Sequence, residues 1–420
     1  MRKYSMNRPV YSLLLTLALP FVPLKLLWRS FKQAEYRQFW AERVGVYNTI
    51  VQKPIIWLHC VSVGETRSAE PLISALQLQY PDYRILLTHG TPTGRDTSTA
   101  IFGDLVSSVY LPYDLPFAVN GFLKHFKPSI GLLMETELWF NLIAVCRQNN
   151  IPLLLLNARL SEKSAKGYAK LGKLACQGLQ NLSSTAAQTT NDAARLQALG
   201  AQNISVVGNL KFDVKPPADS LKKGLQLRQL LDTNRTIFLA ASTREGEEGL
   251  VLEAIKNVDV LTIIVPRHPQ RFNEVETLIK NAGLPYVRRS QLHEPLNKNI
   301  KIVLGDSMGE LFTYYAACDF TFIGGSLLPF GGQNLIEAAR MAKPILIGEH
   351  TFNFAKASRD ALNRGAALQI DDVPSLKEKI IYLANNQAER AKMAQAALAF
   401  SAASTGATAR MMLLIAQYLD

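Results

Sequence analysis

The stretch "IIWLHCVSVGETRSAEPLISALQ", residues 55–77, shows an apolar run followed by an amphipathic segment, a pattern that recurs along the chain. Its opening apolar residues predict a buried strand, and Leu72 and Leu76 follow at helical spacing. The turn "SVGE" separates these two segments and ends on Glu65. A carboxylate has no packing role at a strand-to-helix turn, so Glu65 requires a functional or a helix-capping explanation.

Strand-like runs alternate with amphipathic segments along most of the chain. The runs include "YRILLTHG", "SIGLLMET" and "PLLLLNAR", and later "RTIFLAAS", "VLTIIVPR" and "DFTFIGGS". Continuous apolar strands separated by helices indicate parallel sheets that are covered on both faces. Between the two sets, Pro216 and Pro217 can continue neither a strand nor a helix. We therefore predict an α/β protein with two Rossmann-like domains that face each other across a cleft.

The predicted organisation has five parts, because 420 residues exceed one ordinary core. They are a basic, hydrophobic N-terminus (1–45), a first Rossmann-like domain (46–212), a linker (213–220), a second Rossmann-like domain (221–400) and a C-terminal helix (401–420).

The composition is that of a globular protein, with 48% hydrophobic and 19% charged residues. Four separated cysteines form no CxxC pair, which favours reduced thiols in a cytoplasmic compartment and argues against a zinc site. The net charge of +12 is compatible with nucleic-acid binding, but the basic residues are not interleaved with aromatic residues and no nucleic-acid motif is present. We therefore expect no nucleic-acid partner.

The N-terminus carries half of the net charge. The first fifty residues contain eight lysines and arginines and two glutamates, a net charge of +6 out of +12. Within them, "YSLLLTLALPFVPLKLLW" (11–28) is interrupted by Pro20, Pro23 and Lys25 and lacks a signal-peptide cleavage site. We expect a monotopic or weakly spanning membrane anchor with a basic collar. The alternative is an apolar helix that packs on the protein's own core.

Polar residues follow many of the predicted strands, and ligands of open α/β sheets bind at the carboxyl ends of strands. In the first half, Glu65, Glu135 and Glu137 occupy such positions, and Lys211 lies beside the linker. Because residues i and i+2 of a strand share a face, Glu135 and Glu137 are expected to point the same way. In the second half the strand ends include Ser242, Thr243, Arg267, Ser307, Gly324 and Gly325.

Eight motifs in register carry a resemblance to a known family. They are "HCVSVGE", "METELW", "NARLSEKS", "GNLKFD", "ASTREGEE", "VPRHPQRF", "LGDSMGEL" and "GGSLLPFGGQNLIEAA". Together they resemble the 3-deoxy-D-manno-octulosonic acid (Kdo) transferases of lipopolysaccharide assembly, glycosyltransferases with the GT-B fold, over roughly residues 10–400. The last motif departs from the GGHNPLE common in the family, with Gln333 for His and Leu335 for Pro.

The resemblance implies transfer of Kdo from CMP-Kdo to a lipid A precursor (lipid IVA), with inversion, at the cytoplasmic face of the inner membrane. The first domain would bind the acceptor and the second the donor. An inverting displacement needs a base and no protein nucleophile, and the resemblance implies Glu65 as that base. The structural alternative is a favourable interaction of Glu65 with the helix dipole, worth about 0.3–1 kcal/mol. We expect no metal, since CMP has a single phosphate and no carboxylate cluster has metal-ligand spacing.

The resemblance also implies roles for the remaining strand-end residues. Glu135 and Glu137 would hold the acceptor or assist Glu65, and Lys211 would contact an anionic substrate, although a salt bridge and an ordinary loop lysine are the alternatives. Glycine N–H groups at a helix start suit an anion. The predicted donor-binding residues are Ser242, Thr243, Arg267, Ser307, Met308, Gly309, Gly324, Gly325, Asn334 and Glu337. Within this set Glu337 would bind ribose, and Arg267 the phosphate or the Kdo carboxylate.

Two other functions remain open from the sequence. The first is a different enzyme of the same architecture, such as a nucleotide-sugar epimerase or a UDP-sugar transferase. The second is a non-enzymatic module that binds anionic lipid at a membrane surface. Nucleotide binding separates the enzymes from the lipid-binding module.

Overall fold

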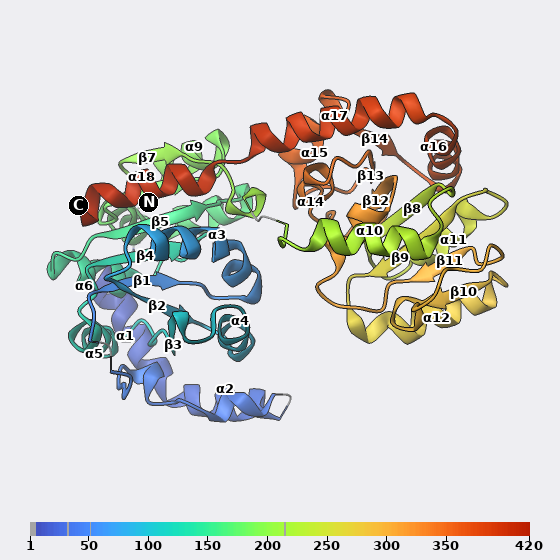
Figure 1. The fold of residues 1–420 in the computed structure, drawn as a ribbon. Helices are drawn as coiled ribbons and strands as arrows, with labels where there is room; N and C mark the ends of the chain where they lie inside the picture. The colour runs from blue at the N-terminus through green and yellow to red at the C-terminus, as the bar shows by residue number, and fades with distance from the viewer. Residues whose placement is uncertain (1–5, 32, 51, 214–215) are drawn as a thin grey trace. The chain divides into compact units, whose positions relative to one another are not determined.

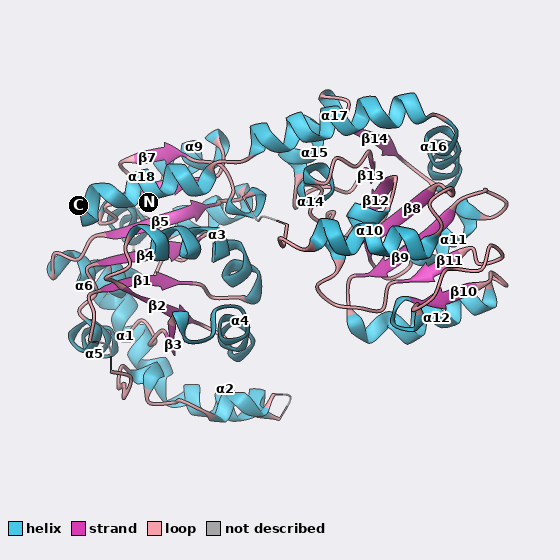
Figure 2. Cartoon of the chain, in the orientation of Figure 1, coloured by secondary structure: helices cyan, strands magenta, loops and turns pink. Residues whose placement is uncertain are grey.

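The computed structural model describes residues 6–31, 33–50, 52–213 and 216–420. The chain forms two compact units, one of Met1–Val214 together with Thr405–Asp420 and the other of Lys215–Ser404. Each unit is a parallel sheet covered by helices, as Figures 1 and 2 show. The prediction of two Rossmann-like α/β domains is confirmed. Of the predicted linker, residues 214 and 215 lie outside the described residues, as do residues 1–5 and 32 of the basic N-terminus.

The sheet of the first unit has the strand order β3-β2-β1-β4-β5-β6-β7, and all neighbouring pairs are parallel. Its strands are β1 (Ile55–His59), β2 (Arg84–His89), β3 (Ser107–Tyr110), β4 (Ile130–Met134), β5 (Leu153–Ala158), β6 (Ser184–Ala187) and β7 (Ile204–Val206). Its helices after the N-terminal segment are α3 (Val63–Gln79), α4 (Pro92–Phe102), α5 (Pro116–Phe126), α6 (Phe140–Gln148), α7 (Glu162–Lys170), α8 (Lys173–Gln180), α9 (Thr190–Ala198) and α18 (Ala407–Leu419).

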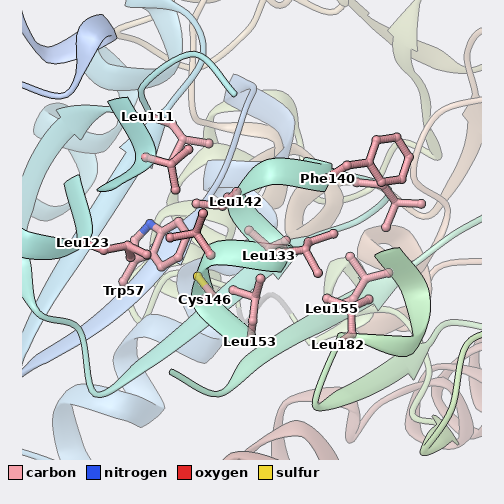
Figure 3. Close-up of a cluster of buried hydrophobic side chains, with 14 of the residues drawn as sticks. Trp57, Leu111, Leu123, Leu133, Phe140, Leu142, Cys146, Leu153, Leu155 and Leu182 are labelled. Atoms are coloured by element: carbon pink, nitrogen blue, oxygen red, sulfur yellow. The ribbon is translucent and has the colours of Figure 1, made fainter. Parts of the chain in front are cut away.

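Alternation along the strands divides this unit's core between the two faces of the sheet. Trp57, Leu133 and Leu155 pack in one cluster, which Figure 3 shows in close-up. Ile56 and Leu58, from the same strand as Trp57, belong to the cluster on the other face. Both faces are therefore buried, which explains why β1 is apolar from Ile55 to Leu58.

The C-terminal end differs from the single helix predicted over 401–420. Helix α17 (Gln387–Ser404) ends before Gly406, whose φ of 95° is left-handed, and α18 follows. The Asp213 carboxylate accepts hydrogen bonds from the backbone N–H groups of Gly406 (2.7 Å) and Thr408 (2.5 Å). Helix α18 then buries Met411 in the core of the first unit. The chain thus returns to the first unit after completing the second.

The sheet of the second unit has the order β10-β11-β9-β8-β12-β13-β14, again parallel throughout. Its strands are β8 (Ile237–Thr243), β9 (Leu261–Pro266), β10 (Tyr286–Arg288), β11 (Ile302–Leu304), β12 (Phe320–Ile323), β13 (Ile345–Gly348) and β14 (Ala367–Ile370). Its helices, besides α17, are α10 (Ser220–Leu231), α11 (Glu247–Ile255), α12 (Phe272–Asn281), α13 (Leu311–Ala317), α14 (Ile336–Arg340), α15 (Ala355–Asn363) and α16 (Val373–Asn385).

The N-terminal segment leaves a long apolar face exposed. Helix α1 (Arg8–Ala18) continues through the turn Leu19–Phe21 into α2 (Val22–Ser30), and only Leu26 and Ser30 of this span are buried. The Tyr11 hydroxyl donates to Asp114 (2.9 Å), which attaches α1 to the first unit. The exposed apolar side chains of the segment are Val10, Leu13, Leu14, Leu17, Phe21, Leu24, Leu27, Trp28 and Phe31. Their spacing of three and four residues places them along one face. The alternative of an apolar helix packed on the protein's own core therefore does not apply to this face.

Two helical spans of the described residues are long and apolar enough to cross a membrane, namely this segment and Gln387–Leu419. The second span consists of α17 and α18, which contribute Phe400 and Ile415 to the protein interior.

Candidate functional site

Glu65 lies on the first turn of α3, three residues after the N-cap residue Ser62. Its carboxylate accepts hydrogen bonds from the Val61 N–H (2.7 Å) and the Ser62 hydroxyl (3.0 Å). The Glu65 N–H in turn donates to the Ser62 hydroxyl (3.4 Å). This arrangement resembles a capping box, so the capping role weighed from the sequence is present in the structure. The same contacts fix the direction of the carboxylate.

The environment of Glu65 favours its protonated form. Burial raises the pKa of Glu65, and the Glu135 carboxylate adds to the rise, while the Val61 N–H and Lys211 lower it. An acid whose pKa is raised in this way is a better base once deprotonated. Capping therefore does not exclude a catalytic role.

Two further carboxylates lie near Glu65. Strand β4 ends at Met134, and Glu135 takes the left-handed conformation with φ of 59°. The prediction that Glu135 and Glu137 share a strand face is therefore wrong, because both lie in the turn after β4. The turn nevertheless brings them together: burial raises the pKa of Glu137 to about 7, with Glu65 as the next cause. Left-handed backbone at a residue other than glycine is strained, and such strain is common at functional sites.

Lys211 is the cation of this group. It belongs to the short 3-10 helix Leu210–Phe212, and its Nζ lies 3.7 Å from the Glu135 carboxylate. The Asn157 side chain at the end of β5 accepts a hydrogen bond from the Leu210 N–H (3.1 Å), which places the segment beside β5. Three carboxylates and one lysine thus gather at the carboxyl ends of β1, β4 and β5. We call Glu65, Glu135, Glu137 and Lys211 the carboxylate cluster.

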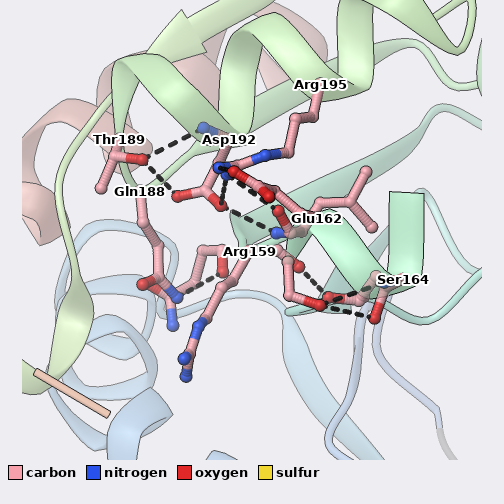
Figure 4. Close-up of polar contacts among 11 residues, drawn as sticks. Arg159, Glu162, Ser164, Gln188, Thr189, Asp192 and Arg195 are labelled. Atoms are coloured by element: carbon pink, nitrogen blue, oxygen red, sulfur yellow. Dashed lines mark hydrogen bonds and ion pairs between the residues drawn. The ribbon is translucent and has the colours of Figure 1, made fainter. Parts of the chain in front are cut away.

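Arg159 is a neighbouring cation that the sequence reasoning left out of the site. Its backbone carbonyl accepts a hydrogen bond from the Thr136 hydroxyl, which ties it to the turn of Glu135 and Glu137. Its side chain is exposed, and Figure 4 shows it pointing away from the hydrogen-bonded group around Asp192. Its place after β5 was the available signal.

In the second unit, a buried carboxylate organises the glycine turn after β12. Glu247 accepts hydrogen bonds from the N–H groups of Arg244 (2.8 Å), Gly325 (2.6 Å) and Leu327 (3.1 Å). The Gly324 N–H donates to Ala241 (2.8 Å). The expectation that the N–H groups of Gly324 and Gly325 are open to an anion is therefore wrong, because both already have partners within the protein. Glu247 came from the motif "ASTREGEE" but was not predicted as a site residue.

The end of β8 presents Ser242 and hides Thr243. The Thr243 hydroxyl is buried and donates to Glu248 (2.7 Å), which also receives two hydrogen bonds from Arg271. Ser242 has a left-handed φ of 57° and a partly exposed side chain. The predicted phosphate contact is thus geometrically open to Ser242 and closed to the Thr243 hydroxyl in this conformation.

Arg267 lies at the end of β9 with an exposed side chain. Its Nε donates to the Gln333 side chain (3.2 Å), at the position where the family often has histidine. The neighbouring Arg244 packs its guanidinium over the Phe330 ring at 4.6 Å. Both arginines therefore come near the glycine turn.

The remaining predicted donor residues fall into two loops. Ser307 donates to Glu310 (2.5 Å), and Met308 and Gly309 follow it in the loop after β11, with 58% of Met308 exposed. At the start of α14, the Asn334 side chain donates to Glu337 (3.0 Å). Among the described residues, no group of three or more His, Cys, Asp or Glu is arranged to hold a metal ion. Independence of metal remains a prediction.

Sequence comparisons with known proteins point to one family. The profile of the family described as 3-deoxy-D-manno-octulosonic-acid transferase (kdotransferase) matches residues 38–214. The chain is 39% identical to the 3-deoxy-D-manno-octulosonic acid transferase of Bordetella pertussis, over 96% of this chain and 98% of that protein. It is 36% identical to the enzyme of the same name from Haemophilus influenzae, over 99% of each chain. Among solved structures, a glycosyltransferase from Rickettsia africae is similar with a TM-score of 0.61 and 15% identity, over 88% of this chain and 100% of that one. The structural similarity shows a shared fold.

Proposed function

This chain belongs to the 3-deoxy-D-manno-octulosonic acid transferase family, and we propose that it transfers Kdo from CMP-Kdo to a hydroxyl of the lipid A precursor lipid IVA, with inversion. The names of the full-length relatives support the transferred sugar. The eight motifs support the same reading across both units.

In this proposal Glu65 is the general base. The acceptor hydroxyl gives its proton to Glu65 as its oxygen forms a bond to the anomeric carbon of Kdo. The bond from that carbon to the phosphate oxygen breaks, and CMP leaves with the electron pair. The observation that carries the assignment is the Glu65 carboxylate held in one direction by Val61 and Ser62, in surroundings that raise its pKa.

Two neighbours shift the protonation of Glu65 in opposite directions. Lys211 stabilises its deprotonated form and attracts an anionic acceptor, while Glu135 disfavours that form. Glu137, with a pKa near 7, can hold a proton at neutral pH and donate a hydrogen bond to the acceptor sugar. The first unit is therefore proposed to bind the acceptor.

The second unit is proposed to bind the donor. Arg267 offers a cation to it, Ser242 a hydroxyl, and Glu337 a carboxylate for the ribose hydroxyls. The loop Ser307–Gly309 would contact the base. Because the donor has one phosphate, positive side chains suffice to receive it, and we propose that no metal takes part.

The N-terminal helix is proposed to hold the enzyme on the cytoplasmic face of the inner membrane, where a lipid acceptor is accessible. The apolar face of α1 and α2 supports this, and so do exposed Lys25, Arg29 and Arg37 beside it.

The test is the mass of the product. Purified protein would be incubated with lipid IVA and CMP-Kdo, with and without EDTA, and the lipid analysed by mass spectrometry. We expect gains in units of Kdo that EDTA does not change. Binding of CMP without any gain would point to another acceptor or to another nucleotide-sugar enzyme. Lipid binding without CMP binding would identify a non-enzymatic membrane module.

A further inference from the structure

We propose that Arg244 and Arg267 form a two-cation site that binds the two anionic groups of the donor. One guanidinium would bind the phosphate and the other the sugar carboxylate. The inference rests on the proposed function. It adds Arg244 as a specificity-determining residue for nucleotide-activated sugars that carry a carboxylate.

The sheet register brings the two arginines together. In the pairing of β8 with β9, Thr243 lies opposite Pro266, so Arg244 and Arg267 are the next residues on neighbouring strand ends. The Arg267 N–H donates to the Thr243 carbonyl (3.0 Å), which extends this pairing by one residue. Both side chains therefore leave the same edge of the sheet, where ligands of open α/β sheets bind.

Each guanidinium is held without being neutralised. Gln333 binds only the Nε of Arg267, and no hydrogen bond of its two terminal nitrogens is found among the described residues. Arg244 rests on the Phe330 ring, which orients a cation but leaves its charge in place. A glycine at position 325 leaves room for the side chains of Gln333 and Arg244, since a Cβ there would lie 3.2 Å from Gln333 Nε2 and 3.4 Å from Arg244 Cγ.

The guanidinium groups of Arg244 and Arg267 have no carboxylate partner among the described residues, because the nearby Glu247 carboxylate accepts from backbone N–H groups instead. Within the described part of the chain, neither Arg244 nor Arg267 has an ion pair, whereas nearby Arg271 binds both Glu248 and Glu274. His268 responds to this excess: its pKa is lowered first by burial and then by Arg244, Arg267 and Arg271. Two unpaired guanidinium groups at neighbouring positions repel each other, and anions between them relieve the repulsion.

The backbone does not offer a substitute for these side chains. The N–H groups of Gly324 and Gly325 have the partners described above, and those of Gly332 and Gln333 donate to Gly325 (2.6 Å) and Gly324 (3.0 Å). These four N–H groups are therefore taken, and the two arginine side chains are the cations nearest to this turn that have no ion-pair partner among the described residues. With two anionic groups on the donor, two arginines match it one to one.

The experiment compares three probes on two variants. Dissociation constants of cytidine and CMP would be measured by calorimetry, and KM for CMP-Kdo in the transfer reaction, for Arg244→Gln and Arg267→Gln. For one variant, we expect the ratio of the cytidine dissociation constant to the CMP dissociation constant to fall at least about tenfold. The other should keep its CMP affinity within about twofold while its KM for CMP-Kdo rises about tenfold or more.

Controls separate this inference from loss of folding and from failure of the proposed function. Lys256→Gln removes an exposed charge from the same unit and should change none of the three quantities. Arg244→Lys keeps the charge and should lose less than Arg244→Gln. The inference is overturned if Arg244→Gln leaves the CMP affinity and the KM for CMP-Kdo at their wild-type values. It is also overturned if both variants lose CMP affinity, because then neither arginine would be assigned to the sugar carboxylate. A wild-type protein that binds no CMP would instead refute the proposed function.

Discussion

The Glu65 carboxylate accepts a hydrogen bond from the Val61 N–H at 2.7 Å, back across the turn between β1 and α3. This contact closes the start of the helix and also fixes where the carboxylate points. A single carboxylate thus caps the helix and is held in one direction.

Lys211 and Glu135 should shift the pH dependence of transfer in opposite directions. Lys211 lowers the pKa of Glu65 and Glu135 raises it. Activity is lost at low pH when the base is protonated, so Lys211→Met should move the acidic limb of kcat/KM to higher pH, and Glu135→Gln to lower pH. Lys124→Met, an exposed lysine of the same unit, is the control. Identical limbs in all four proteins would exclude Glu65 as the group that titrates.

Glu137 should make the protein less stable as pH rises. Its pKa is about 7 in the folded protein and near the ordinary 4.5 in the unfolded chain. Between these values the folded state binds more protons, so the free energy of unfolding falls as pH rises through this window. The urea midpoint should drop less between pH 5 and pH 7.5 in Glu137→Gln than in the wild type. The exposed Glu70→Gln should retain the wild-type drop; equal drops in all three proteins would contradict the assignment.

Glu247 should be a stability residue of the second unit. Glu247→Ala leaves three N–H groups without their partner, those of Arg244, Gly325 and Leu327. Unsatisfied buried donors of this kind cost about 3 kcal/mol together, after partial relaxation. Urea unfolding would measure this, with exposed Glu245→Ala as the matched control. A loss no larger than that of the control would mean that the turn is held by other contacts.

The exposed face of the N-terminal helix should determine membrane binding. Replacing Leu14, Leu17 and Leu24 by glutamate puts three charges on a face that is now apolar. The affinity for anionic vesicles, measured by co-sedimentation, should fall by about tenfold or more. The control places two charges on exposed Leu221 and Leu225 of α10 and should leave sedimentation unchanged. Equal sedimentation of both variants and the wild type would rule out the helix as the anchor.

The sequence predicts the two sheets well because their signal is local. Each strand is a short apolar run, and predicted site residues follow the strands closely, as Arg267 does directly after β9 and Glu65 on the first turn of the helix after β1. The packing of α18 on the first unit has no such local signal in the sequence. Its apolar face would fit many cores, and its place on the first unit follows from contacts far apart in sequence, such as the burial of Met411 and the N–H groups of Gly406 and Thr408 that donate to Asp213.

The site was harder to predict where backbone conformation or shared partners decide it. The left-handed turn at Glu135 brings Glu135 and Glu137 together by a route that strand periodicity does not describe. The Gly325 N–H appeared open to an anion because nothing near it in sequence binds it, but Glu247 reaches it from 78 residues away. The importance of Arg244 likewise follows from the pairing of β8 with β9.

The most direct test of the central claim is the rate of Kdo transfer by Glu65→Gln compared with the wild type. The wild type and the variant would be given saturating CMP-Kdo and lipid IVA in detergent, with CMP affinity measured on the same preparations. If Glu65 is the base, the rate should fall by about 10²–10⁴-fold while CMP affinity stays within about twofold. A variant that transfers Kdo at close to the wild-type rate, with intact CMP binding, would contradict the account and leave Glu65 as a helix cap.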